Sequence, residues 1–221
     1  MKKWGLVVTG LYGLIVLGLL VPSTLFLVSS SSLSLHNLKQ AYAEWITWIC
    51  AAVLISSQFL LLWVSADTTR RRLKPRTPVV LSAVLTAFLM MILTLAGGLA
   101  IIVTWAVVSP RELPRWIYVP LLVLAATWIF WGTLFYRYWK DSDDPVTSAV
   151  KWLFRGSVLE LLVAVPSHVI VRRRDDCCAP PITAFGIVTG IAIMLLSFGP
   201  SVLLLFKKRM EKYETKGPLA G

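Results

Sequence analysis

The chain has 221 residues, of which 57% are hydrophobic, and its 22 Lys and Arg exceed its 11 Asp and Glu to give a net charge of +11. Ordinary soluble domains contain about 45–50% apolar residues, so this composition excludes a typical water-soluble protein. A basic chain would suit nucleic acid, but no aromatic-basic binding module is present and we expect no nucleic-acid partner. The basic residues lie instead at the ends of apolar runs, where anionic lipid headgroups attract them.

The apolar runs predict an all-α integral membrane protein, a bundle of six transmembrane helices that forms a single polytopic membrane domain over residues 1–209. An α-helix needs about 20 apolar residues to cross roughly 30 Å of hydrocarbon. Residues 210–221 are predicted to be a short charged cytoplasmic tail. The predicted spans cover residues 4–28, 45–66, 78–108, 117–138, 150–171 and 182–206.

Several residues predict local features along these spans. Pro22 is expected to kink the first span, and residues 33–44 are expected to form a short helix at the membrane interface. Gln58 is expected to bridge two helices by hydrogen bonding. In the last span, Gly186 and Gly190 form a Gly-x-x-x-Gly pattern, which predicts a close approach between helices.

Residues 147–171 are ambiguous as a transmembrane segment. Their continuous apolar part has only 15 residues, about 23 Å of helix and short for a crossing. The alternative architecture has five spans plus a re-entrant or interfacial helix at 147–171. Six spans place sixteen Lys and Arg inside and six outside, whereas five spans place fourteen and eight. The positive-inside rule therefore favours six spans, with both termini cytoplasmic in a prokaryotic plasma (inner) membrane.

Two adjacent cysteines, Cys177 and Cys178, end a dense polar stretch before the last span. Consecutive Cα atoms are about 3.8 Å apart, below the usual 4.4–6.8 Å of a disulfide, so a bond between them would be strained. Neighbouring thiolates suit a soft metal such as Cu, Zn or Hg, with Cys50 and His168 as further candidate ligands on the same outer face. A disulfide from Cys50 to one of the pair is an alternative, and a purely structural role for the three cysteines is another. No other cofactor is predicted.

Glu160 is the only carboxylate inside an apolar run, and it lies about 5 Å from the middle of the segment if that segment crosses the membrane. An ionisable residue at that depth is costly and typical of a functional site. His168 follows eight residues later, with Pro166 between them. These two residues are the candidate catalytic or transport groups, able to pass protons or hold a cation. Alternatively, Glu160 pairs with a buried basic or hydroxyl group, or it lies in water at the interface.

No P-loop, G-x-S-x-G, H-E-x-x-H or dinucleotide-binding fingerprint occurs in the chain. The sequence therefore favours a non-catalytic subunit, anchor or assembly factor of a membrane complex over an enzyme. Its expected partners are the lipid bilayer and either other membrane proteins or further copies of itself. Two alternatives are a thiol- or soft-metal-handling membrane protein that uses the vicinal cysteines, and a small transporter or membrane enzyme that uses Glu160 and His168.

Overall fold

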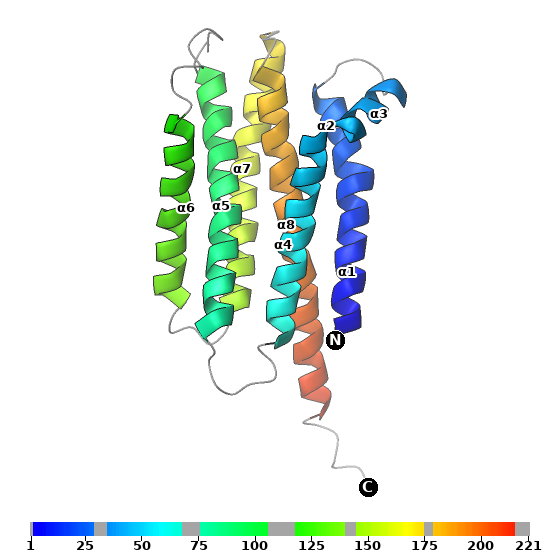
Figure 1. The fold of residues 1–221 in the computed structure, drawn as a ribbon, viewed down its shortest axis with the longest axis vertical. Helices are drawn as coiled ribbons and strands as arrows, with labels where there is room; N and C mark the ends of the chain where they lie inside the picture. The colour runs from blue at the N-terminus through cyan, green and yellow to red at the C-terminus, as the bar shows by residue number, and fades with distance from the viewer. Residues whose placement is uncertain are drawn as a thin grey trace.

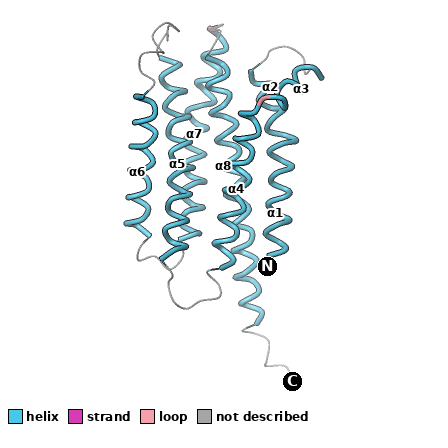
Figure 2. The backbone as a smooth tube through the Cα atoms, in the orientation of Figure 1, coloured by secondary structure: helices cyan, strands magenta, loops and turns pink. Residues whose placement is uncertain are grey.

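The computed structural model describes residues 2–28, 35–67, 76–105, 118–139, 145–174 and 179–214. Within these ranges only Glu44 and Arg174 lie outside helices, and no strand occurs (Figure 2). The predicted all-α class is confirmed for this part of the chain. The elements are α1 (Lys2–Ile15), the π-helical segment η1 (Val16–Leu20), α2 (Val21–Val28), α3 (Leu35–Ala43), α4 (Trp45–Asp67), α5 (Arg76–Trp105), α6 (Tyr118–Trp139), α7 (Pro145–Arg173) and α8 (Ala179–Glu214).

Five described helices are long and apolar enough to cross a membrane. The long helix outside this set is α6, whose 22 residues reach about 33 Å but end in the polar aromatic sequence Tyr-Arg-Tyr-Trp. An all-helical membrane protein is therefore supported, while the sixth crossing stays a prediction. The qualifying stretches are Gly5–Thr24, Trp45–Trp63, Val79–Trp105, Val146–Arg173 and Pro180–Gly199.

The ambiguous stretch 147–171 lies inside α7, a continuous helix of 29 residues, about 43 Å long. The apolar run of 15 residues gave too short an estimate of the helix length. Lys151 and Arg155 interrupt the apolar run but not the helix. The length of α7 suffices for a crossing, and the choice between six and five spans stays a prediction. Likewise, α8 continues to Glu214, so residues 210–214 of the predicted tail are helical.

The long helices stand side by side and alternate in direction, so that the start of α1 and the end of α8 lie at the same end of the bundle (Figure 1). Helix α8 is central. It packs on α7 and α5 on one side, and on α1, α2 and α4 on the other. Helix α6 lies at the edge and packs on α5, while α3 lies at the end opposite the termini (Figure 1). This central position makes α8 the element most relevant to any site inside the bundle.

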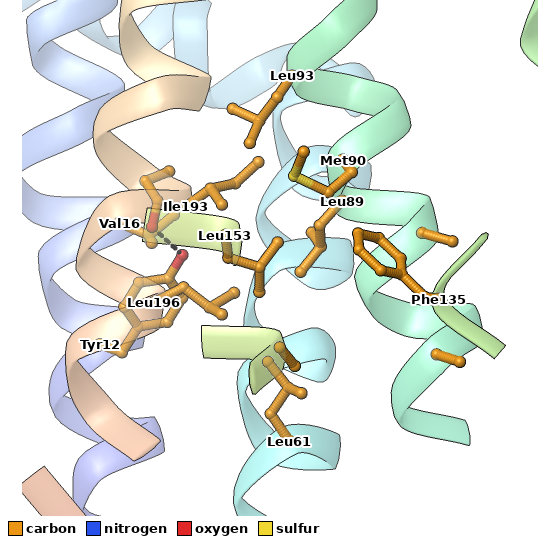
Figure 3. Close-up of a cluster of buried hydrophobic side chains, with 14 of the residues drawn as sticks. Tyr12, Val16, Leu61, Leu89, Met90, Leu93, Phe135, Leu153, Ile193 and Leu196 are labelled. Atoms are coloured by element: carbon orange, nitrogen blue, oxygen red, sulfur yellow. Dashed lines mark hydrogen bonds between the residues drawn. The ribbon is translucent and has the colours of Figure 1, made fainter. Parts of the chain in front are cut away.

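A cluster of buried apolar side chains joins helices from both sides of α8 (Figure 3). The Tyr12 hydroxyl of α1 enters this cluster and donates a hydrogen bond of 3.0 Å to the Ala192 carbonyl of α8. That bond fixes the depth of α1 relative to α8. Fully buried members from the other helices include Leu61, Leu89, Phe135, Leu153 and Ile193.

The π-helical segment η1 lies directly before Pro22, where the sequence predicts a kink. Here the Val21 N–H donates to the Val16 carbonyl, five residues back. Continuing this pattern would pair the Leu17 carbonyl with the N–H of residue 22, which proline lacks. The Tyr42 hydroxyl of α3 donates to that Leu17 carbonyl instead. The short helix predicted at residues 33–44 is observed as α3. It is bonded to the first span through the Leu17 carbonyl, which Pro22 leaves without a backbone donor.

Candidate functional site at the interface of α7 and α8

Glu160 lies on the buried face of α7 and is 5% exposed. Residues three or four apart share one face of a helix, and Leu153, Ser157, Glu160 and Ala164 follow this spacing and are all buried. The periodicity of α7 therefore directs Glu160 into the bundle. This placement excludes, for Glu160, the alternative of a solvated carboxylate at the interface.

Three glycines from two helices surround the Glu160 side chain; we call Gly97 of α5 and Gly186 and Gly190 of α8 the glycine cradle. A Cβ atom added to Gly97 would lie 3.7 Å from Glu160 Cγ, an ordinary contact. A Cβ on Gly186 would lie 3.0 Å from Oε1, and one on Gly190 only 1.9 Å from Oε2. The Gly186-x-x-x-Gly190 pattern does mark a close approach, but the group that approaches is the carboxyl of Glu160.

Neither carboxyl oxygen of Glu160 has a hydrogen-bond partner among the described residues. A Cα–H bond of Gly190 points toward Oε2, because the hydrogen takes the direction of the missing Cβ, and such contacts are only weak hydrogen bonds. An unpaired carboxylate at this depth costs several kcal/mol on most estimates, whereas a neutral carboxyl costs much less. The cradle therefore suits a protonated Glu160, and the predicted basic or hydroxyl partner is not found in the described part of the chain.

His168 is also buried on α7, and it bonds to the start of α8. Its Nδ1 lies 2.8 Å from Thr183 Oγ1, and the Thr183 hydroxyl donates to the Pro180 carbonyl at 3.1 Å. Which of the two groups donates depends on the tautomer of the imidazole. The buried Nε2 has no hydrogen-bond partner in the described ranges.

Glu160 and His168 do not contact each other directly, because Glu160 has no hydrogen-bond partner in the described chain. Eight residues of helix separate them by about 12 Å. Ala164 lies between them, and a Cβ on Gly186 would approach its Cβ to 3.4 Å. The structure thus places both candidates on one interface but as two separate polar positions.

The candidate metal ligands are only partly placed. Cys177 and Cys178 lie outside the described residues, so the soft-metal site stays a prediction. Cys50 of α4 is a half-buried free thiol. It lines a cavity of about 260 Å³ that Pro181, at the start of α8, also lines, and the disulfide from Cys50 to Cys177 or Cys178 stays a prediction. The described ranges contain no group of three or more His, Cys, Asp or Glu side chains that could hold a metal ion.

Sequence reasoning missed a polar contact between two helices. Arg174 donates from Nη1 to the Thr104 carbonyl at 2.7 Å, joining the end of α7 to the last turn of α5. A basic group at a helix C-terminus is a common capping arrangement, but the sequence does not say which helix Arg174 would cap. Gln58, predicted to bridge two helices by hydrogen bonding, packs against α8, where a Cβ on Gly199 would lie 2.0 Å from its Nε2. Its Oε1 has no hydrogen-bond partner among the described residues.

Gln58 of α4 and Glu160 of α7 therefore both pack against glycines of α8. Of these, Glu160 has the chemistry of a reversible proton-binding group, since a carboxyl can gain or lose a proton where an amide cannot. Comparison of the chain with protein-family models, with curated proteins and with solved structures found no match.

Proposed function

We propose that this chain is a small proton-linked transporter or membrane enzyme that binds and releases a proton at Glu160. The observation that carries the proposal is a carboxyl group 5% exposed, with no hydrogen-bond partner among the described residues, between three membrane-length helices. Ionisable residues at such depth are costly, and they occur on ion pathways and proton relays.

The surroundings of Glu160 favour a proton over a metal ion. Hard cations such as Ca²⁺ and Mg²⁺ require about six or more oxygen ligands. The glycine cradle presents no side chains, and no cluster of acidic or other metal-binding side chains occurs in the described ranges. A proton needs only the carboxyl oxygen itself.

A non-catalytic subunit, anchor or assembly factor has no need of an unpaired carboxyl inside the bundle. The geometry therefore supports proton binding better, and the subunit role stays a prediction that co-purification of a stoichiometric partner would favour. The thiol- or metal-handling alternative depends on Cys177 and Cys178, so it stays a prediction as well.

Infrared spectroscopy of the full-length protein in lipid vesicles tests proton binding. The wild type should show the carbonyl stretch of a protonated carboxyl, and Glu160→Gln should lack it, because the amide cannot ionise. Raising the pH should remove this band while the helices stay folded. Glu44, which is exposed, provides the matched control: Glu44→Gln should leave the band unchanged.

Two results would contradict the proposal. If wild type and Glu160→Gln share every protonated-carboxyl band, Glu160 does not hold a proton. If the band persists at every pH at which the protein is folded, Glu160 holds its proton permanently and releases none.

We further propose that both termini face the cytoplasm of a prokaryotic cell. The position of the start of α1 and the end of α8 at the same end of the bundle (Figure 1) and the sixteen-to-six division of Lys and Arg support this orientation. A reporter fused after Gly221 should be active in the cytoplasm, while one fused after Leu113 should report the opposite side. A C-terminal reporter outside the cytoplasm would refute the orientation.

A further inference from the structure

The two faces of α8 are packed very differently. Residues two apart on a helix point about 200° away from each other, so Val188 and Gly190 face in nearly opposite directions. Gly190 is pressed against Glu160 of α7. Val188 instead lines the cavity of about 260 Å³ that α8 shares with η1, α2 and α4. One face of α8 therefore has no free space, while the other borders a void.

No charged side chain lines this cavity. Among its hydroxyl groups, Thr24 donates to the Val21 carbonyl at 2.6 Å and Thr189 to the Phe185 carbonyl at 2.9 Å, each within its own helix. These two hydroxyls therefore make their bonds without tying α8 to the helices across the cavity. The Tyr12 bond to the Ala192 carbonyl is farther along α8 than the cavity residues and provides a pivot.

No group in this packing stabilises the negative charge of an ionised Glu160. Among the described residues, α5 and α8 present no titratable or charged side chain to the carboxyl. On α7 the nearest such groups are Arg155, which is exposed, and His168, which is bonded to Thr183. The close approach of Gly190 leaves no room for water at Oε2. A carboxylate here can be solvated only if α8 moves away.

We propose that proton release from Glu160 drives the first third of α8, Ala179–Gly190, out of the glycine cradle and into the apolar cavity on its opposite face. This inference rests on the proposed proton binding at Glu160. The shift opens a path for water to the carboxylate and breaks the bond between His168 and Thr183. Reprotonation removes the charge, and α8 returns to the cradle.

Cys50 is a native reporter of this movement, because it lines the cavity that α8 would enter. The experiment measures alkylation of Cys50 by N-ethylmaleimide in full-length protein in vesicles, with the Cys50 peptide quantified by mass spectrometry. The rate is compared between wild type and Glu160→Gln at each pH. Their ratio cancels the ionisation of the thiol itself, which both proteins share.

At low pH, where Glu160 is protonated, the ratio of wild-type to variant rates should be close to one. At the pH where infrared spectra show Glu160 ionised, it should fall several-fold, since α8 then covers Cys50. A constant or rising ratio despite ionisation would overturn the inference and leave proton binding intact. A carboxyl that never ionises would overturn both.

Filling the cavity provides a second test. Val188→Phe should hold α8 in the cradle, so Glu160 should keep its proton to a higher pH than in the wild type. Val165→Phe adds the same group to an exposed position of α7 and should leave the titration unchanged. A wild-type titration in folded Val188→Phe would overturn the inference; if Val188→Phe does not fold, the Cys50 ratio decides.

Discussion

Replacing Phe135 with alanine should lower the free energy of unfolding by about 2 kcal/mol and loosen α6 from the bundle. Phe135 is fully buried and contacts Trp152 of α7 edge to face, with ring centroids 5.9 Å apart. Within α6 it also stacks on Trp139 and Trp131, at 4.8 and 5.3 Å. Phe→Ala in a soluble core costs about 3–5 kcal/mol. Lipid is as apolar as the bundle interior, so the transfer part of this cost is small and the packing part remains.

Phe130→Ala is the matched control, because Phe130 is on the same helix but 59% exposed. Its cost should be below about 0.5 kcal/mol. The measurement is reversible unfolding in mixed micelles, followed by tryptophan fluorescence, which also reports the surroundings of Trp131 and Trp139. Equal effects of the two substitutions would mean that the aromatic cluster does not hold α6.

The helix positions were largely predictable from the sequence. The second span was predicted at residues 45–66 and α4 covers Trp45–Asp67, because apolar run length and flanking polar residues act locally. The end of α8 was not predictable in this way. Lys207 and its basic neighbours mark the end of a membrane segment, but Lys and Arg are good helix formers and the helix continues to Glu214.

The candidate site was predictable only in its parts. Glu160 stood out as a lone carboxylate in an apolar run, and Gly186 and Gly190 stood out by their spacing. That they meet depends on the rotation and depth of α7 relative to α8, which arise from packing across the whole bundle and leave no local pattern. For the same reason Pro22 predicted a kink, but not that Tyr42 would donate to the Leu17 carbonyl.

Replacing Gly190 with alanine should destabilise the protein by about 1–3 kcal/mol, the usual cost of overpacking. Alanine is otherwise favoured over glycine in a helix by roughly 0.5–1 kcal/mol. Helix propensity alone would therefore predict that this substitution stabilises the protein, whereas we expect it to destabilise the protein. The new Cβ would lie 1.9 Å from Glu160 Oε2 and 3.0 Å from two atoms of Leu161. Gly98→Ala is the control, because a Cβ there meets nothing within 4 Å, and it should be neutral or slightly stabilising.

A double-mutant cycle identifies which neighbour opposes the alanine. The free energies of unfolding of Gly190→Ala, Glu160→Ala and the double variant are measured in the same micelles. If the carboxyl fills the cradle, Gly190→Ala should cost at least 1 kcal/mol less when Glu160 is already alanine, since contacting residues couple by about 0.5–3 kcal/mol. If Gly190→Ala costs the same with Glu160 present and with Glu160 replaced, the clash is with Leu161. Gly190 would then serve only the packing of α8 against α7.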